Sequence, residues 1–237
     1  MISLADDPSG SSPEKVLRFK HGTLNASSGN AQRIEGNVSR HIKANRVVCE
    51  VELYIPSTIK GDKFKASPID WFTIQEYWSG RTTGNIERRT TLSLKKKKGD
   101  ESLFFDLALS DVNLHTNTIT NLVENRIADY ALEFDKWIRL RVEIEPGDDR
   151  NGKIRTVVRP EGGEEYVFEK IVRTVYPVED YENSPRPIFE DFSVIKLYTS
   201  AAYVRNGVFS SGNGGAVSNV EIFFRNCRVD CVCAVDE

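Results

Sequence analysis

Residues 71–78 (Trp-Phe-Thr-Ile-Gln-Glu-Tyr-Trp) place an amide among aromatic rings in a stretch that otherwise suits a buried strand. Side chains alternate between the two faces of a strand. We therefore expect Trp71, Gln75 and Tyr77 to share the outward face. Ile74 is then expected to face the core. Aromatic rings can stack on sugar rings, and an amide can donate and accept hydrogen bonds, so this face has the chemistry of a carbohydrate contact.

A second segment, residues 194–200 (Val-Ile-Lys-Leu-Tyr-Thr-Ser), shows the same alternation. Lys196 and Tyr198 are two positions apart, which predicts that both point outward from one strand. If the two segments belong to one sheet, their outward faces combine aromatic rings, an amide, an ammonium group and a phenol. Such a surface suits a sugar chain, and the ammonium group favours an acidic one.

The elements that would position these side chains are strands. Apolar and polar residues alternate over residues 46–55 and 137–145, and turn sequences rich in glycine, proline and aspartate separate such segments along the chain. Regularly spaced antiparallel strands with one polar face each predict an all-β, two-sheet antiparallel sandwich. We expect a flexible N-terminus over residues 1–14 and a single domain over residues 15–237.

Two stretches fit the strand pattern less directly. The apolar spacing over residues 119–134 allows one short helix or a structured loop. The lysine run at residues 95–98 is followed by Gly99 and Asp100, and it predicts a solvated hairpin tip.

Six short segments follow one another in an order that carries a family resemblance. In chain order they are Arg33-Ile34-Glu35, residues 47–56, Ile74-Gln75, residues 137–142, Ile195-Lys196-Leu197-Tyr198 and residues 220–224. This order resembles the concanavalin-like polysaccharide lyases of the alginate-lyase and glucuronan-lyase type. The resemblance implies a jelly-roll β-sandwich with a concave face, and cleavage of a uronic-acid-containing polysaccharide by β-elimination.

The resemblance also implies roles for individual residues. In β-elimination a base removes the C5 proton, which is acidic only when donors mask the neighbouring carboxylate. Gln75, Arg33 and His41 would mask that charge. Tyr198 would act as base and acid, with Lys196 favouring its deprotonated form. The other side chains expected to contact the polymer are Tyr77, Trp71, Trp78, Arg139 and Arg141.

Other interpretations stay open. Alginate lyases usually carry a histidine two residues after the glutamine, where this chain has Tyr77, and Lys196 replaces a turn glycine. A non-catalytic, lectin-like module could use the same aromatic rings as stacking platforms. A structural or adhesion domain without a sugar site is a third interpretation. Retaining glycoside hydrolysis is disfavoured, because Glu50-Val51-Glu52 lacks the third acid of the glucanase pattern.

Charge and hydropathy limit the partners. The 237 residues carry a formal net charge of -3, so no global basic field attracts nucleic acid. No apolar stretch reaches the roughly 18 residues of a membrane-spanning helix. We expect a monomer that binds an acidic polysaccharide, without nucleic acid or membrane insertion. A secreted or periplasmic location is expected, although this chain shows no signal peptide.

Metals and cofactors are not required by this chemistry. We expect no cofactor, although a structural calcium ion is compatible with such folds. Cys49 lies within an apolar strand and is expected to be a buried thiol. Cys227, Cys231 and Cys233 have a spacing that fits no common zinc module, and a disulfide between two of them stays open.

Overall fold

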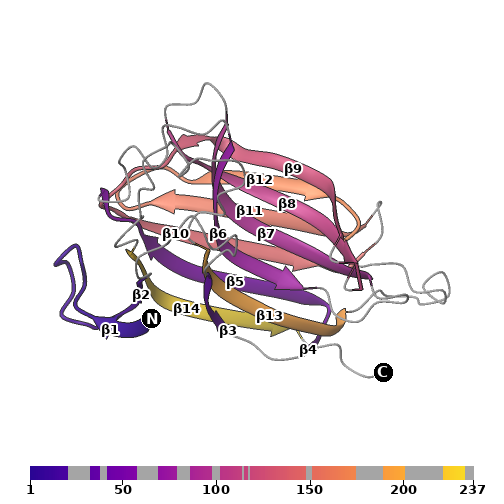
Figure 1. Cartoon of the computed structure of the whole chain (residues 1–237), viewed down its shortest axis with the longest axis horizontal. Coiled ribbons are helices and arrows are strands. Elements are labelled where there is room, and N and C mark those ends of the chain that lie inside the picture. Colours follow the sequence, from indigo (N-terminus) through magenta and orange to yellow (C-terminus); the bar gives the residue numbers. More distant parts are fainter. Residues whose placement is uncertain are drawn as a thin grey trace.

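In a computed structural model, the protein consists of two antiparallel β-sheets packed face to face (Figure 1). The structure describes residues 1–20, 33–37, 42–57, 69–78, 86–97, 102–113, 115–116, 118–147, 151–174, 189–200 and 221–232. For some strand residues, including 33–37 and 189–200, it describes the course of the backbone alone.

One sheet, which we call the flat sheet, has seven strands. In spatial order they are β1 (Ile2–Ala5), β2 (Val16–Lys20), β14 (Glu221–Val232), β5 (Arg46–Tyr54), β10 (Trp137–Glu145), β11 (Lys153–Pro160) and β12 (Tyr166–Ile171). Its members come from both ends of the chain, as the colours in Figure 1 show.

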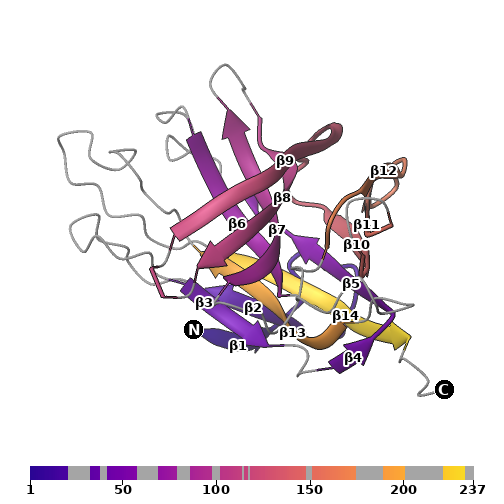
Figure 2. The same cartoon turned by 90° about the vertical axis from the view of Figure 1, so that its right-hand side faces the viewer.

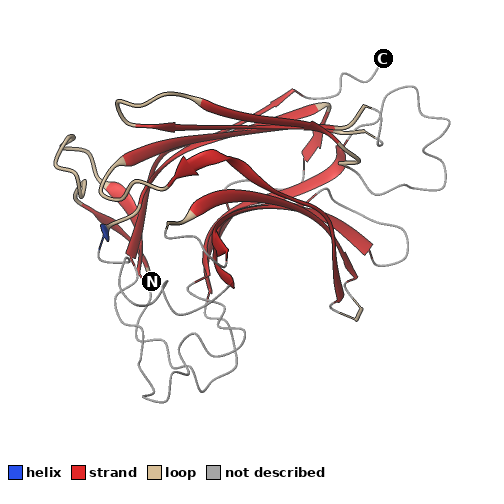
Figure 3. Cartoon of the chain, turned by 90° about the horizontal axis from the view of Figure 1, so that it is seen from above, coloured by secondary structure: helices blue, strands red, loops and turns tan. Residues whose placement is uncertain are grey.

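The second sheet, which we call the curled sheet, is strongly bent. In spatial order its strands are β3 (Arg33–Asn37), β13 (Phe189–Ser200), β6 (Ile69–Trp78), β7 (Ile86–Lys97), β8 (Phe104–Asn113) and β9 (Thr118–Ala131), and the short β4 (Ile42–Ala44) also pairs with β13. Figure 3 shows it as an arch whose concave side is directed away from the flat sheet. The concave side is therefore the face of the curled sheet that does not pack on the flat sheet, and Figure 2 gives a second view of the two sheets.

Alternating side chains place one face of each sheet in a common core. On the flat sheet, β5 and β10 pair so that Cys49 lies opposite Val142 and Val51 lies opposite Leu140. The curled sheet contributes Ile74, Tyr77, Leu92, Leu94, Phe105, Leu107 and Leu109 to the same buried cluster. The prediction of an all-β, two-sheet jelly-roll sandwich with a concave face is confirmed.

Side-chain contacts join the two sheets along one edge. Arg88 on β7 is buried and forms two hydrogen bonds with the Asp111 carboxylate on β8, at 2.6 and 3.1 Å. The same guanidinium group donates to the carbonyl oxygen of Arg173, just after β12, at 2.6 Å. Nearby, the rings of Tyr130 on β9 and Tyr166 on β12 lie 4.9 Å apart. The edge of the sandwich is therefore closed by a paired cation and by two tilted tyrosine rings.

Two expectations from the sequence were wrong. Most of residues 119–134 form a strand rather than a helix or a loop, because β9 occupies Thr118–Ala131 and pairs with β8. Ladder hydrogen bonds and packing outweigh local helical spacing here. The lysine run is not simply a hairpin tip either. Lys95 lies within β7 and forms an ion pair with the buried Asp106 on β8, with Nζ and Oδ1 3.2 Å apart.

The N-terminal residues belong to the flat sheet. The segment expected to be flexible, residues 1–14, contains β1, which pairs with β2. After β1, the buried Asp7 carboxylate accepts hydrogen bonds from the Ser9 hydroxyl at 2.6 Å, the Trp137 indole at 3.1 Å and Arg225 at 3.0 Å. Arg225 also lies over the Trp137 ring, 4.1 Å from its centroid. One carboxylate thus ties the N-terminal segment to β10 and β14.

This cluster predicts a stability effect that depends on pH. Burial raises the pKa of Asp7, but the hydrogen bonds from Ser9, Trp137 and Ser11 outweigh it and lower the pKa to about 2. A lowered pKa stabilises the fold above the unfolded value of 3.8, and this contribution is lost as the pH falls toward about 2. Asp7→Asn should therefore reduce the free energy of unfolding at pH 7 by roughly 2 kcal/mol.

Urea denaturation at pH 7 and at pH 2.5 measures this effect, with Asp6→Asn as the matched control. Asp6 is exposed and pairs only with the exposed Lys15 among the described residues. The Asp7 variant should lose its deficit at the lower pH, whereas the Asp6 variant should resemble the wild type at both. Equal stability of the two variants at pH 7 would contradict the proposed role of Asp7.

Candidate functional site

A β-bulge in β6 decides which of its side chains reach the concave face. Thr73 pairs with Ser93 of β7, but the next pair is Gln75 with Leu92, so Ile74 is an extra residue. Such a bulge turns two successive residues toward the same side. Ile74 and Gln75 are accordingly both fully buried, with 0% of the surface of each residue exposed. The simple alternation assumed from the sequence does not hold across this position.

The expectation that Gln75 and Tyr77 face outward is therefore wrong. Both point toward β5 of the flat sheet, where the Tyr77 hydroxyl donates to Gln75 Oε1 at 2.7 Å and Gln75 Nε2 lies 3.7 Å from Cys49 Sγ. Burial raises the pKa of Cys49 to about 12 and the pKa of Tyr77 well above its usual range. The expected buried thiol is confirmed, and its polar partners are these two side chains.

The concave face instead carries charged side chains in cross-strand pairs. After the bulge, Glu76 lies on the face opposite to the core, and its Oε1 is 3.1 Å from Nη1 of Arg89 on β7. Farther along β7, Lys95 pairs with Asp106 of β8. Glu76 and Asp106 are buried, with only 6% and 2% of their surface exposed. Carboxylates this deeply buried are stabilised by the cations beside them.

A third cation lies farther along the same sheet. Arg126 on β9 is paired in register with Asp106 of β8, and its guanidinium carbon lies 3.7 Å from the centre of the Phe104 ring. Among the described side chains of this face, three cations (Arg89, Lys95 and Arg126) accompany two acids (Glu76 and Asp106), a difference of one positive charge. Such a face can attract a polymer that carries carboxylates.

The backbone register brings several predicted site residues to this sheet. Lys196 on β13 lies opposite Glu76 of β6 and, on the other side, opposite Asn37 of β3. Tyr198 lies opposite Glu35, and Arg33 lies opposite Ser200. The segments around Gln75 and Tyr198 therefore lie in one sheet, which meets the condition that the sequence left open.

The two tryptophans of β6 lie in the same sheet. Trp71 is paired in register with Lys95 of β7, and Trp78 is paired with Arg89. The backbone positions of both tryptophans are therefore next to β7, the strand that carries Arg89 and Lys95.

Two predicted residues belong elsewhere, and one lies outside the described residues. Arg139 and Arg141 are on β10 of the flat sheet, and their side chains are partly exposed on the face directed away from the core. They therefore lie on a different sheet from Tyr198, and their expected contact with the polymer stays a prediction. His41 is outside the described residues.

Sequence reasoning missed Arg89, Lys95, Asp106 and Arg126. The apolar-polar alternation over β7 could have placed Arg89 and Lys95 on one face, but the lysine run was interpreted as a turn.

The described residues show neither a metal cluster nor a membrane-spanning helix. Across these residues, no three Asp, Glu, His or Cys side chains are grouped closely enough to hold a metal ion. The expectation that no cofactor is required, with a structural calcium ion compatible with the fold, stays a prediction. None of the described elements is a helix with the length and apolarity needed to cross a membrane.

Solved structures of polysaccharide lyases share this architecture. A PL-14 alginate lyase from Aplysia kurodai matches with a TM-score of 0.57 and 14% identity, over 97% of this chain and 87% of its own. An endo-β-1,4-glucuronan lyase from the fungus Trichoderma reesei matches with a TM-score of 0.57 and 11% identity, over 98% and 87%. This chain has their jelly-roll fold.

A further match is a variant of the alginate lyase Aly36B in complex with an alginate tetrasaccharide, with a TM-score of 0.54 and 10% identity over 92% of this chain and 81% of that one. No protein-family model and no curated protein sequence matches the chain. Identities this low establish the architecture and not the activity, since one fold can carry unrelated functions.

The core position of Gln75 predicts a stability effect. Gln75→Leu would leave the buried Tyr77 hydroxyl without its acceptor and should lower the free energy of unfolding by about 1–3 kcal/mol. The double variant Gln75→Leu/Tyr77→Phe removes both polar groups, so it should lose less than the sum of the two single changes. Urea denaturation of the three variants measures this coupling. Strictly additive losses would contradict the hydrogen bond between the two side chains.

Proposed function

We propose that this protein is a polysaccharide lyase that cleaves a uronic-acid-containing polysaccharide by β-elimination on the concave face of the curled sheet. The observation that supports this most is the register of β13, which brings Lys196 opposite Glu76 and Tyr198 opposite Glu35 within one sheet. The neighbouring strand β7 adds Arg89 and Lys95. The jelly-roll fold shared with alginate and glucuronan lyases supports the same assignment.

The proposed reaction needs one base and one acid. The Tyr198 phenolate takes the proton from C5 of the uronate, the C4–O bond breaks, and a double bond forms between C4 and C5. The departing oxygen takes up a proton, which the Tyr198 phenol supplies. Arg33 masks the uronate carboxylate, because a guanidinium group can donate two parallel hydrogen bonds to it. Lys196 favours the phenolate by its positive charge.

Four further predicted residues, Gln75, His41, Trp71 and Trp78, are assigned as follows. Gln75 takes no part in the proposed site, because its amide is in the core. His41 stays a proposed second donor to the carboxylate. Trp71 and Trp78, paired in register with Lys95 and Arg89, are proposed to stack on sugar rings beside the cationic strand. We also propose that the protein acts as a secreted or periplasmic monomer and needs no cofactor.

An absorbance assay tests the proposal. The purified protein is incubated with glucuronan, polymannuronate and polyguluronate, and the near-ultraviolet absorbance of the new C4–C5 double bond is followed. We expect absorbance to rise with at least one polymer and Tyr198→Phe to lower the rate by at least about a hundredfold, since general acid–base groups contribute about 10²–10⁴.

Tyr166→Phe is the matched control, because Tyr166 lies on β12 of the flat sheet and should leave the rate unchanged. Unchanged activity in Tyr198→Phe would contradict the assignment of the base. Absence of absorbance with every polymer would contradict the lyase. If affinity electrophoresis then still showed retardation by a polymer, the protein would be a lectin-like binding module.

A further inference from the structure

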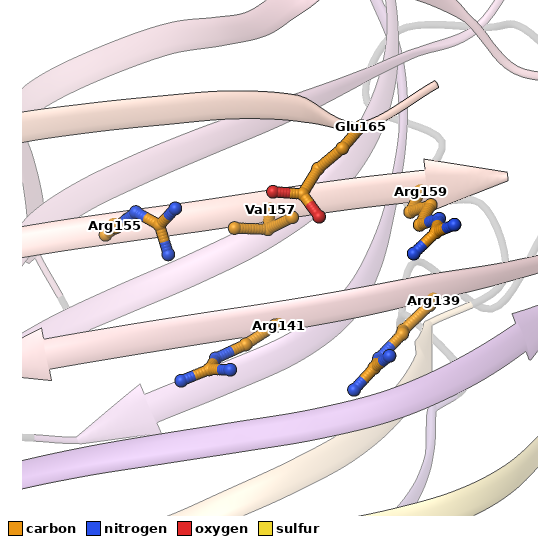
Figure 4. A pocket seen from close by; sticks show the side chains of 6 residues that line it. All are labelled: Arg139, Arg141, Arg155, Val157, Arg159 and Glu165. Atoms are coloured by element: carbon orange, nitrogen blue, oxygen red, sulfur yellow. The ribbon is translucent and has the colours of Figure 1, made fainter. Parts of the chain in front are cut away.

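The flat sheet carries a small pocket on its outer face, directed away from the curled sheet. It lies over β10 and β11 and has a volume of about 110 Å³. Its lining residues are Arg139, Arg141, Arg155, Val157, Arg159 and Glu165. Figure 4 shows Val157 between the arginines of β11, with the Glu165 carboxylate reaching over it. This pocket lies on the opposite sheet from the proposed catalytic face.

The pocket concentrates positive charge. Its lining has four arginines and one glutamate, which gives a net charge of 4 − 1 = +3. Arg139 and Arg159 lie directly opposite each other in the register of β10 and β11. Like charges in such a cross-strand pair are destabilising. An anion bound between them would relieve this repulsion.

Carboxylates around the pocket pair with three of its four arginines. Glu143 is shared by three guanidinium groups, at 2.9 Å from Arg141, 3.3 Å from Arg155 and in direct contact with Arg46. Hydrogen bonds and charges from these arginines outweigh burial and lower the pKa of Glu143. Arg155 also lies 3.7 Å from Glu169, and Arg139 pairs with Glu50, so Arg159 is the lining arginine left without an ion pair among the described residues.

Two donors of the pocket are left for a ligand. Within the described part of the chain, Arg159 makes no ion pair, and its side chain is exposed. The Nε atom of Arg141 is buried and has no hydrogen-bond acceptor among the same residues. A guanidinium group offers a planar pair of donors that matches a carboxylate or a sulfate. Arg141 and Arg159 both line the pocket.

The pocket is large enough for a small charged group. A volume of about 110 Å³ is several times the roughly 10–15 Å³ that one water molecule needs on the same measure. The pocket can hold a carboxylate and the carbon that carries it, while the rest of a chain runs along the surface.

We infer that this arginine pocket is a second, non-catalytic subsite that binds the carboxylate of a uronic-acid residue. The choice of a uronate rests on the proposed function, whereas the binding of an oxyanion rests on the pocket alone. Because the pocket and the concave face lie on different sheets, one long polymer or two polymers could engage both. Occupation of two sites on one protein raises the apparent affinity for long chains without any new contact.

Titration followed by nuclear magnetic resonance tests the inference. The probes are methyl β-D-glucuronide, which has no 4-linked sugar to eliminate, and inorganic sulfate, in a low-chloride buffer. We expect the Nε–Hε signals of Arg139, Arg141 and Arg159 to shift and saturate with the glucuronide. Arg159→Gln should weaken this binding by about tenfold, which corresponds to one lost charge-assisted contact.

Arg228→Gln is the matched control, because Arg228 lies on β14 of the same outer face, is exposed and pairs with Asp230. It should leave the affinity unchanged. Shifts with sulfate alone would overturn the assignment to a uronate in favour of a sulfate or phosphate ester. No saturable shift with either probe, or equal effects of the two substitutions, would overturn the pocket as a site.

The outcome can be separated from that of the lyase assay. Saturable binding of the glucuronide that Arg159→Gln weakens, without double-bond formation on any polymer, would leave the pocket standing and remove the lyase. Double-bond formation without binding at these arginines would support the lyase and overturn the pocket as a site.

Discussion

The bulge at Ile74 in β6 is the constraint on which the faces of the curled sheet depend. It inserts one residue into the strand and so changes which of the following side chains enter the core. Gln75 and Tyr77 are turned toward the flat sheet, and Glu76 is turned toward the concave face. Without the bulge, the alternation would exchange these positions, because a shift of one residue moves every later side chain to the other face.

The same constraint explains the polar groups inside the core. An amide, a phenol and a thiol would each be costly to bury alone, but Gln75, Tyr77 and Cys49 contact one another. The contact crosses from the curled sheet to the flat sheet, so it favours one position of β6 over β5 in the packed sandwich. The paired Arg88 has a similar effect at the edge, where it joins β7 to the segment after β12. Polar contacts thus add specificity to a core that is mostly apolar.

The two outer faces of the sandwich distribute charge differently. On the concave face, buried acids are each held by a cation on the next strand, as in Glu76 with Arg89 and Asp106 with Lys95. On the outer face of the flat sheet, Glu143 is shared among three arginines, and Arg159 has no ion pair within the described part of the chain. Both arrangements suit an acidic polymer, although only the concave face adjoins the strand that carries Tyr198.

Much of the architecture was determined by the sequence alone. Strict alternation over β10 and β5, with turn residues between segments, is enough to predict antiparallel strands and a two-sheet sandwich, because period and polarity are local properties. The order of the six segments also carried the resemblance that implied a jelly roll. The orientation of Gln75 was decided only by the tertiary structure, since a bulge depends on how two strands pair. The separation of Arg139 from the concave face was decided in the same way, because sheet membership depends on pairing between distant segments of the chain.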